Sequence, residues 1–356
     1  MTARTTWLAA LSRSPRRRVA SAAVGFTALA VLAGAAIVAA RPDTPAEVAG
    51  QRAVSLLSGP PSVQEGPGVA ALSTASDSHG RLISVSAGAS RAGVSRASAS
   101  RAVARLTCAR FHAAAGTGLC LRLDGDLTTY QLTVLDSGLR VRSQIPLVGV
   151  PNRARVSPSG HLVSWTVFVT GDSYNGGRFS TRVGILDTRT DTLVPTLEDW
   201  SVTVADRPYH AKDLNFWGVT FASDDRHFYA TMSTAGHRYL VHGDLGTHRL
   251  TTVRDGVECP SLSPDGTRVA FKSARDGDPR HGWRLSVLDL ATGHVTALAE
   301  ERSVDDQAVW LDSRTVAYGL RRGRDHSDVW QTPADGTGRP HVLIPDAESP
   351  ATLTTP

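Results

Sequence analysis

The stretch from Val257 to Ala299 sets the strongest constraint on how this chain folds. Four short apolar runs alternate in it with turn sequences, and Ser263-Pro264-Asp265-Gly266 separates the first two runs. Proline at the second position of a turn presets φ, and glycine at the last position accepts the conformation that the exit requires. Val269–Phe271 and Leu285–Leu288 have strand composition, and residues 289–293 close a second hairpin. A four-stranded meander cannot bury both faces alone, so it requires copies beside it.

The same order of strands and turns recurs in four further units. Corresponding turns are about 40–65 residues apart, and the widest spacing reflects an insertion around Glu198–His210. This period is typical of the blades of a β-propeller. The strands predicted in the four further units are 107–111, 119–123, 130–135 and 139–145; 153–156, 162–168, 182–187 and 192–197; 215–221, 227–232, 239–244 and 250–253; and 307–310, 315–320, 328–330 and 341–344.

The predicted fold is therefore an all-β propeller of four-stranded blades, with six blades expected and five as the alternative. A sixth blade must come from Val69–Leu106, where only Leu82–Val85 has a strand pattern and 87–104 is a low-complexity segment. Propellers close their ring to protect strand edges, so a strand from one terminus is expected to complete the blade begun at the other. The propeller is predicted to span residues 69–346, with a C-terminal tail over 347–356.

The positive charge of the chain belongs to its leader. The formal net charge is +5, and residues 1–41 carry six arginines and no acid, so +5 − 6 leaves the remainder near −1. A nucleic-acid partner requires cations clustered on the folded domain, so none is expected. The basic segment 1–18 precedes a charge-free run, 19–40, that is long enough to cross a bilayer.

The order of charge and apolarity in the leader predicts a location. Positive charge before a membrane segment favours a cytoplasmic N-terminus, so the chain after Arg41 is expected outside the cytoplasm, with 41–68 as a flexible proline-rich linker. A single-pass membrane anchor is predicted. The alternative is a secreted protein, because Val38-Ala39-Ala40 also satisfies the small-residue rule for cleavage of a signal peptide.

Polar residues precede or begin the first strand of several units. In a propeller these positions reach one mouth of the central channel, so side chains distant in sequence converge there. The ring is predicted to bind a peptide terminus or a cationic group, because acids outnumber its single arginine; the alternative is a wet channel rim with no ligand. The predicted ring contains Arg153, Asp213, Asn215, Trp217, Glu258, Asp305, Asp306 and Gln307.

Two of the three cysteines are predicted to pair. Cys108 and Cys120 lie in successive strands of one unit, and an exported domain favours disulfide formation. If the intervening turn is centred near Gly116, Cys120 opposes His112, so the bridge requires a bulge or a wider loop. Cys259 then remains as a buried thiol. The alternative is three free, buried thiols.

In its hairpin and turn motifs the chain resembles the TolB-type β-propeller family, whose blades carry a Ser-Pro-Asp-Gly hairpin and an Asp-x-x-x-Gly turn. The matching segments are 262–271 with 288–293, and 156–160 with 186–187, and the resemblance covers about residues 107–345. The arrangement is also similar to anchored or secreted TolB-like proteins of high-GC bacteria. The resemblance implies a propeller outside the cytoplasm. The family includes proteins that bind partners in envelope complexes and the propeller domains of serine peptidases.

The sequence contains no strong catalytic or metal-binding motif. A Gly-x-Ser-x-Gly nucleophile motif does not occur, the twelve histidines have no ligand spacing, and 172–177 lacks the acid density of a calcium loop. No metal and no cofactor are expected. We therefore predict a non-enzymatic platform that binds an envelope protein or peptide. The alternative is a hydrolase or lyase of envelope glycans that uses mouth carboxylates such as Glu258 and Asp305.

Overall fold

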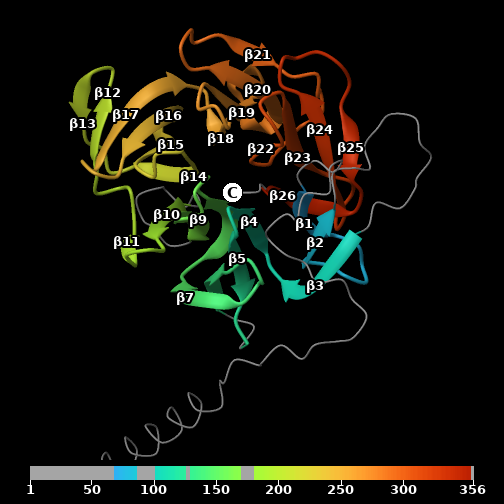
Figure 1. The fold of residues 1–356 in the computed structure, drawn as a ribbon. Coiled ribbons are helices and arrows are strands. Elements are labelled where there is room, and N and C mark those ends of the chain that lie inside the picture. The colour runs from blue at the N-terminus through green and yellow to red at the C-terminus, as the bar shows by residue number, and fades with distance from the viewer. Residues whose placement is uncertain (1–67, 86–100, 126–128, 170–179, 354–356) are drawn as a thin grey trace, which may run out of the picture. The chain divides into compact units, whose positions relative to one another are not determined.

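The computed structural model of the chain describes residues 68–85, 101–125, 129–169 and 180–353, and these form six β-sheets (Figure 1). The sheets are the blades of one propeller, so the prediction of six blades is confirmed. The predicted basic segment 1–18, the apolar segment 19–40 and the linker as far as residue 67 lie outside the described residues, as does the loop 172–177.

Each blade is an antiparallel meander, and blade 4 carries two additional strands. From the axis outward, blade 1 contains β26 (Ala347–Leu353), β1 (Gly68–Ser73), β2 (Arg81–Val85) and β3 (Arg101–Thr107); blade 2 contains β4 (Arg110–Ala114), β5 (Thr117–Leu123), β6 (Tyr130–Leu135) and β7 (Val141–Leu147); and blade 3 contains β8 (Val150–Val156), β9 (Leu162–Val169), β10 (Ser180–Asp187) and β11 (Thr192–Val194).

The remaining blades follow the same order. Blade 4 contains β14 (Asn215–Phe221), β15 (His227–Thr234), β16 (His237–Asp244), β17 (Arg249–Asp255), β12 (Ser201–Val204) and β13 (Arg207–Tyr209); blade 5 contains β18 (Glu258–Leu262), β19 (Arg268–Ala274), β20 (Trp283–Asp289) and β21 (Val295–Ala297), with the short 3-10 turns η3 (Arg275–Gly277) and η4 (Pro279–His281) between β19 and β20; and blade 6 contains β22 (Val309–Trp310), β23 (Thr315–Arg321), β24 (Ser327–Pro333) and β25 (His341–Ile344).

Each of the six hydrophobic clusters in the described residues lies between two neighbouring blades. Tyr318 of blade 6, for example, shares a cluster with Leu285 of blade 5, and Ala347 of blade 1 shares one with Val329 of blade 6. Every blade therefore buries one face against the blade before it and the other against the blade after it. This is the arrangement that a repeat unable to stand alone requires.

Blade 1 closes the ring with strands from both ends of the described chain. The C-terminal strand β26 pairs with β1, as in Gly68 with Leu353, and Thr352 Oγ1 donates a hydrogen bond to the carbonyl oxygen of Trp310 in blade 6. The expected joining of the two ends is thus present. The expectation of a tail from residue 347 is wrong for 347–353, because these residues form the innermost strand of blade 1.

The outer strand of blade 1 also departs from expectation. The sequence predicts no strand in 87–104, yet β3 begins at Arg101. Its small side chains are sufficient because an outermost strand packs only lightly, and Ala102 and Ala104 lie against the cluster between blades 1 and 2. Pairing with β2 thus overrides a sequence of weak strand propensity.

The hairpin that separates the first two strands of blade 5 has the predicted geometry. The amide of Gly266 donates to the carbonyl of Ser263 across 2.9 Å, and Gly266 has φ +71. Asp265 then accepts hydrogen bonds from Ser263 Oγ and from the amide of Thr267. The proline and glycine positions therefore fix this turn as the sequence indicates.

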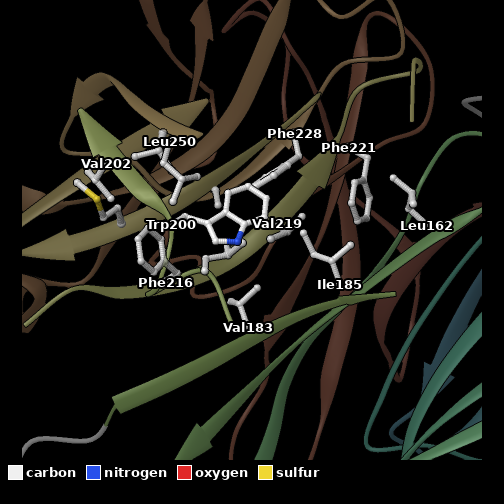
Figure 2. Close-up of a cluster of buried hydrophobic side chains, with 14 residues drawn as sticks. Leu162, Val183, Ile185, Trp200, Val202, Phe216, Val219, Phe221, Phe228 and Leu250 are labelled. Carbon is white, nitrogen blue, oxygen red and sulfur yellow. The ribbon is translucent and has the colours of Figure 1, made fainter. Parts of the chain in front are cut away.

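The insertion 198–210 extends blade 4 rather than forming a separate element. Its hairpin, β12 and β13, adds to the outside of the blade, and β12 pairs in parallel with β17. Trp200, just before β12, packs into the cluster between blades 3 and 4, beside Val183 of β10 and Val219 of β14 (Figure 2). The insertion is therefore anchored by Trp200 together with Val202 of β12.

The propeller has two different faces. We call the face at which the innermost strands begin the N-face, and the face at which they end the C-face. Because β1 is antiparallel to β26 and Gly68 pairs with Leu353, both ends of the described chain lie at the C-face. Neither end of the described chain therefore interrupts the N-face.

Cys108 and Cys120 form a disulfide, with Cα atoms 5.5 Å apart. The bridge is made without a bulge, because Cys108 lies before β4 and outside its ladder, whereas Cys120 opposes Phe111 within it. The sequence pattern places Cys120 opposite His112, one residue away from its observed partner. Cys259 is a free, buried thiol.

Counting thiols tests this arrangement. Without reductant, we expect no thiol to react with Ellman's reagent in the native protein, one to react after unfolding, and three after unfolding and reduction, because only Cys259 is unpaired and it is buried. The variant Cys259→Ser should give none without reductant. Three reactive thiols in the unreduced, unfolded protein would show that the bridge is absent.

Candidate functional site

Charged side chains from five blades meet around the axis on the N-face side of the propeller. Arg153 Nη2 in blade 3 lies 3.9 Å from Asp305 Oδ1. Asp305 is in the loop before β22 of blade 6, and blade 6 lies on the opposite side of the ring from blade 3. Inner-strand positions bring these groups together although they are about 150 residues apart in sequence. We call this group the axial cluster; it contains Arg110, Arg153, Glu258, Lys272, Asp305, Asp306 and Glu348.

Lys272 is the buried cation at the blade 5 side of the cluster. Its ammonium group is bonded to Asp305 Oδ1 and lies 3.9 Å from the centre of the Trp283 ring. Asp305 itself is exposed over 67% of its side chain. Surrounding protein raises the pKa of Asp305 through desolvation, but attraction to Lys272 and Arg153 outweighs this, so its pKa is lowered and it stays ionised.

Glu258 differs from Asp305 because it is buried. It pairs with Lys272 in the register of β18 and β19, and its Oε1 lies 3.6 Å from Arg238 Nε in blade 4. Burial raises the pKa of Glu258, while Lys272 and Arg238 oppose that effect. The two carboxylates that the sequence placed in one ring therefore have pKa values shifted in opposite directions.

Arg110 and Glu348 complete the cluster on blades 2 and 1. Arg110 Nη1 lies 3.5 Å from Glu348 Oε1, and its Nε donates to the carbonyl of Asn152 at 2.8 Å. Asp306 accepts a hydrogen bond from the amide of Gly319 and interacts electrostatically with Arg110 and Arg153. The cluster is thus a mixed set of charges, with four acids and three cations.

Two side chains cross the axis beneath the cluster. Arg155 in blade 3 donates from Nη2 to the carbonyl of Ala308 in blade 6, at 3.2 Å. Gln307 Nε2 donates to the carbonyls of Gly218, Val219 and Pro260 in blades 4 and 5. These bonds tie blades on different sides of the ring to one another and form a polar floor at the axis.

His112 is held neutral at this floor. Arg155 Nη1 lies 3.0 Å from His112 Nε2, and the amide of Val156 lies 3.1 Å from Nδ1. Both neighbours are donors, so the neutral ring can accept from only one of them, and a second proton would leave it unable to accept from either. Burial and the positive charge of Arg155 lower the pKa of His112 well below its ordinary value of 6.5.

Acidification is therefore expected to destabilise the protein through His112. Above pH 6.5 the imidazole is neutral in both the folded and the unfolded chain; below it the unfolded chain binds a proton that the folded chain excludes, so stability falls as the pH falls. The limiting loss is about 1.4 kcal/mol per pH unit for one proton. Urea unfolding at pH 7 and pH 5 should show this loss in the wild type, with a smaller loss in His112→Gln.

The exposed His294 supplies a matched control for that measurement, since His294→Gln removes an imidazole far from the floor. Carboxylates contribute equally to the pH dependence of the unfolding free energy in the wild type and the variant, so their contribution cancels when the two are subtracted. An identical pH dependence in wild type and His112→Gln would contradict a neutral, buried His112.

The structure divides the predicted ring into two groups. Arg153, Glu258, Asp305 and Asp306 belong to the axial cluster, and Gln307 lies in the floor. Three other predicted members have different partners: Asp213 accepts from Thr234 Oγ1 and the amide of Ala235 at a hairpin of blade 4, Asn215 accepts from Thr181 in blade 3, and Trp217 lies under Arg238.

The predicted ring contains a single arginine, but Arg110 and Lys272 also reach the cluster, so three cations face its four acids, and Arg155 lies just beneath it. Position before an inner strand does not reveal Lys272, which lies in a second strand; Arg110, by contrast, begins the inner strand β4. One signal was available: Lys272 is one of only two lysines in the chain, and strand pairing places it opposite Glu258.

The residues that the structure describes contain neither a membrane-spanning helix nor a metal-binding group. Within 68–353, less the gaps, no helix is long and apolar enough to span a membrane, and the predicted segment 19–40 lies outside that range. In the same residues no three or more His, Cys, Asp or Glu side chains are arranged to hold a metal ion.

No protein-family model matches the chain. Two curated proteins named Protein TolB homolog are similar to part of it: that of Chlorobium luteolum is 43% identical over 68 residues, and that of Chlorobium chlorochromatii is 39% identical over 70 residues. These segments cover 18% and 20% of this chain, and only 15% of each relative's length.

Solved structures share the fold over a much longer stretch. The crystal structure of TolB from Acinetobacter baumannii matches with a TM-score of 0.57 and 15% identity, over 81% of this chain and 66% of that one. A chain of a nidogen/laminin complex matches with a TM-score of 0.51 and 9% identity, over 81% of this chain and 98% of that one. Together with the blade motifs and the six closed blades, the local identity to TolB homologs confirms the resemblance: the chain is a TolB-like β-propeller.

Proposed function

We propose that this propeller is a non-enzymatic binding platform of the cell envelope, which takes an envelope protein or peptide at its N-face. The observation that supports the proposal is the convergence of charged side chains from five blades in the axial cluster. A partner placed there contacts several rigid strands at once. Such a site is already organised before the partner arrives, which reduces the entropy lost on binding.

The surroundings of the cluster suit a protein partner. Half-buried Trp283 lies beside Lys272, and half-buried Trp217 lies under Arg238, which in turn pairs with Glu258. Tryptophan and arginine are the side chains that most often dominate the binding energy of protein interfaces. Polar charge at the centre and aromatic rings beside it are therefore consistent with a protein-binding face.

The proposed location is outside the cytoplasm, either anchored through 19–40 or secreted after cleavage of that segment. The arginine-rich start followed by an apolar run supports export. The Cys108–Cys120 bridge supports an oxidising compartment, because disulfides persist there and are rare in the cytosol. The local identity to TolB homologs supports an association with the envelope.

The geometry does not favour a glycan hydrolase as a second proposal. Opposite pKa shifts at Glu258 and Asp305 are a pattern found in acid–base pairs. However, Glu258 is buried and faces Arg238, and Asp305 is bonded to Lys272. A catalytic acid must reach the glycosidic oxygen, whereas these carboxylates are occupied as counterions. If the protein hydrolysed or cleaved an envelope glycan, that result would contradict the proposal of a non-enzymatic platform.

Capture of partners from the envelope tests the proposal. The tagged full-length chain is expected to recover a saturable protein partner. Arg321 ends β23 at the N-face and interacts electrostatically with Arg110 and Asp305, and the double variant Trp283→Ala, Arg321→Glu should recover at least tenfold less. The matched control Arg189→Glu, Leu193→Ala changes exposed residues of the outer part of blade 3 and should recover as much as the wild type. Equal recovery by both double variants, or turnover of an envelope glycan, would contradict the proposal.

A further inference from the structure

Arg155 is a buried cation with an unused donor. It is only 7% exposed, its Nη1 lies 3.0 Å from His112 Nε2, its Nη2 donates to the carbonyl of Ala308, and its Nε has no hydrogen-bond partner. No ion pair between Arg155 and a carboxylate is present among the residues that the structure describes. Burial and repulsion from Arg153 both act against its charge, and Asp306 offsets them only in part.

Arg153 repeats the same feature one step closer to the N-face. Its Nε is also buried without a partner, and its closest carboxylate oxygen, on Asp305, lies 3.9 Å away. Residues two apart in a strand point to the same side, so Arg153 and Arg155 present their guanidinium groups on one side of β8. Two adjacent arginines therefore share unused N–H groups in a region of low dielectric.

The acids nearby are engaged with other groups. Asp305 is bonded to Lys272, Asp306 accepts from the amide of Gly319, and Glu348 lies beside Arg110. Glu258 lies beside Arg238, and burial favours its neutral form. Four cations, Arg110, Arg153, Arg155 and Lys272, therefore lie at the axis beside these four acids.

Arg153 is the member of the arginine pair that lies nearer to solvent. Arg153 retains 11% exposure of its side chain, and the neighbouring Asp305 retains 67%. A planar guanidinium binds two oxygens of a carboxylate or a phosphate in parallel, and these charge-assisted bonds are strong when water is excluded. The two unused Nε–H groups, one on each arginine, are donors that the oxygens of an oxyanion can accept and that a cationic group cannot.

We propose that the axis of the propeller is an oxyanion site, in which Arg153 and Arg155 bind the carboxylate or phosphate group of a ligand that enters from the N-face. The inference deepens the proposed function and rests on it for the source of the ligand, namely an acidic group on the partner. Of the two ligands expected from the sequence, a peptide terminus or a cationic group, it is compatible with the carboxyl terminus of a peptide and not with a cationic group.

Binding of small oxyanions to the full-length protein tests the inference directly. Acetate and inorganic phosphate, titrated at constant ionic strength, are expected to raise Tm saturably, and the better of the two identifies the group. Arg153→Gln should weaken the affinity at least tenfold, and Asp305→Asn should strengthen it several-fold, because it removes a competing negative charge. The exposed Arg254→Gln is the control and should change nothing.

The outcomes separate this inference from the proposed function. Absence of a saturable shift with both oxyanions, an equal shift with chloride, or weaker binding by Asp305→Asn would overturn the oxyanion site. Arg155→Gln provides a second variant. Even if this substitution lowers Tm, the oxyanion concentration that half-saturates the shift still gives its dissociation constant for the oxyanion. If the protein still captures its partner when the oxyanion is present at 100 times its dissociation constant, the oxyanion site is overturned but the proposed binding platform is not. If the oxyanion binds but no protein partner is recovered, the binding platform is overturned but the oxyanion site is not.

Discussion

A chain that ends at Asp346 is expected to lose its cooperative unfolding transition and to elute as aggregates rather than as a monomer. Removing β26 takes the innermost strand from blade 1 and leaves the ladder edge of β1 without its partner. It also removes the buried side chains of Ala347, Ala351 and Leu353 from the clusters that join blade 1 to blades 6 and 2. An open ring has unprotected edges and two uncovered blade faces, so most of the stability typical of a domain, roughly 5–15 kcal/mol, should be lost.

A chain that ends at Leu353 is the matched control, because it keeps every residue of β26. It should unfold in urea with the same midpoint and slope as the full chain when followed by tryptophan fluorescence and by far-ultraviolet circular dichroism. Size-exclusion chromatography reports the oligomeric state of each form. A monomeric, cooperatively folding chain that ends at Asp346 would show that closure through β26 is dispensable.

β26 also shows why the sequence predicted most of the fold and missed this part of it. The blades with proline and glycine in their hairpins, such as Ser263–Gly266, carry local signals that fix the turn before any tertiary contact forms. β26 has no such signal: it contains Pro350, and Ser349 has φ +51. Its strand conformation comes from pairing with β1 across almost the whole chain, so local propensity could not reveal it.

The candidate site was predictable to the extent that it depends on strand order. Because inner strands meet at the axis, the repeat alone places Arg153, Glu258 and Asp305 near one another, as they lie in the structure. What the repeat could not give is the direction of each side chain. Asp213 turns to cap a hairpin of its own blade, whereas Lys272 reaches the axis from a second strand. The balance of acids and cations at the axis follows from such details.

Trp200→Ala is expected to lower the free energy of unfolding by about 3–5 kcal/mol, a large loss for the truncation of one side chain. Trp200 is 7% exposed, lies edge-on to Phe228 at 5.7 Å between ring centres, and stacks on His248 at 4.8 Å. Figure 2 shows it among side chains of β10 and β14, so the insertion fills part of the junction between blades 3 and 4. Truncation to alanine leaves a cavity that the two blades cannot close without shifting.

Two measurements distinguish loss of this junction from simple release of the β12–β13 hairpin. Urea unfolding gives the global free energy, and hydrogen exchange gives the protection of Val202 in the hairpin and of Phe216 in blade 4. If Trp200 supports the junction, global stability and protection at Phe216 both fall. The half-exposed Leu193→Ala on β11 is the control and should change stability by no more than about 0.5 kcal/mol. A loss below about 1 kcal/mol for Trp200→Ala, with protection lost only at Val202, would mean that the hairpin decorates the propeller without stabilising it.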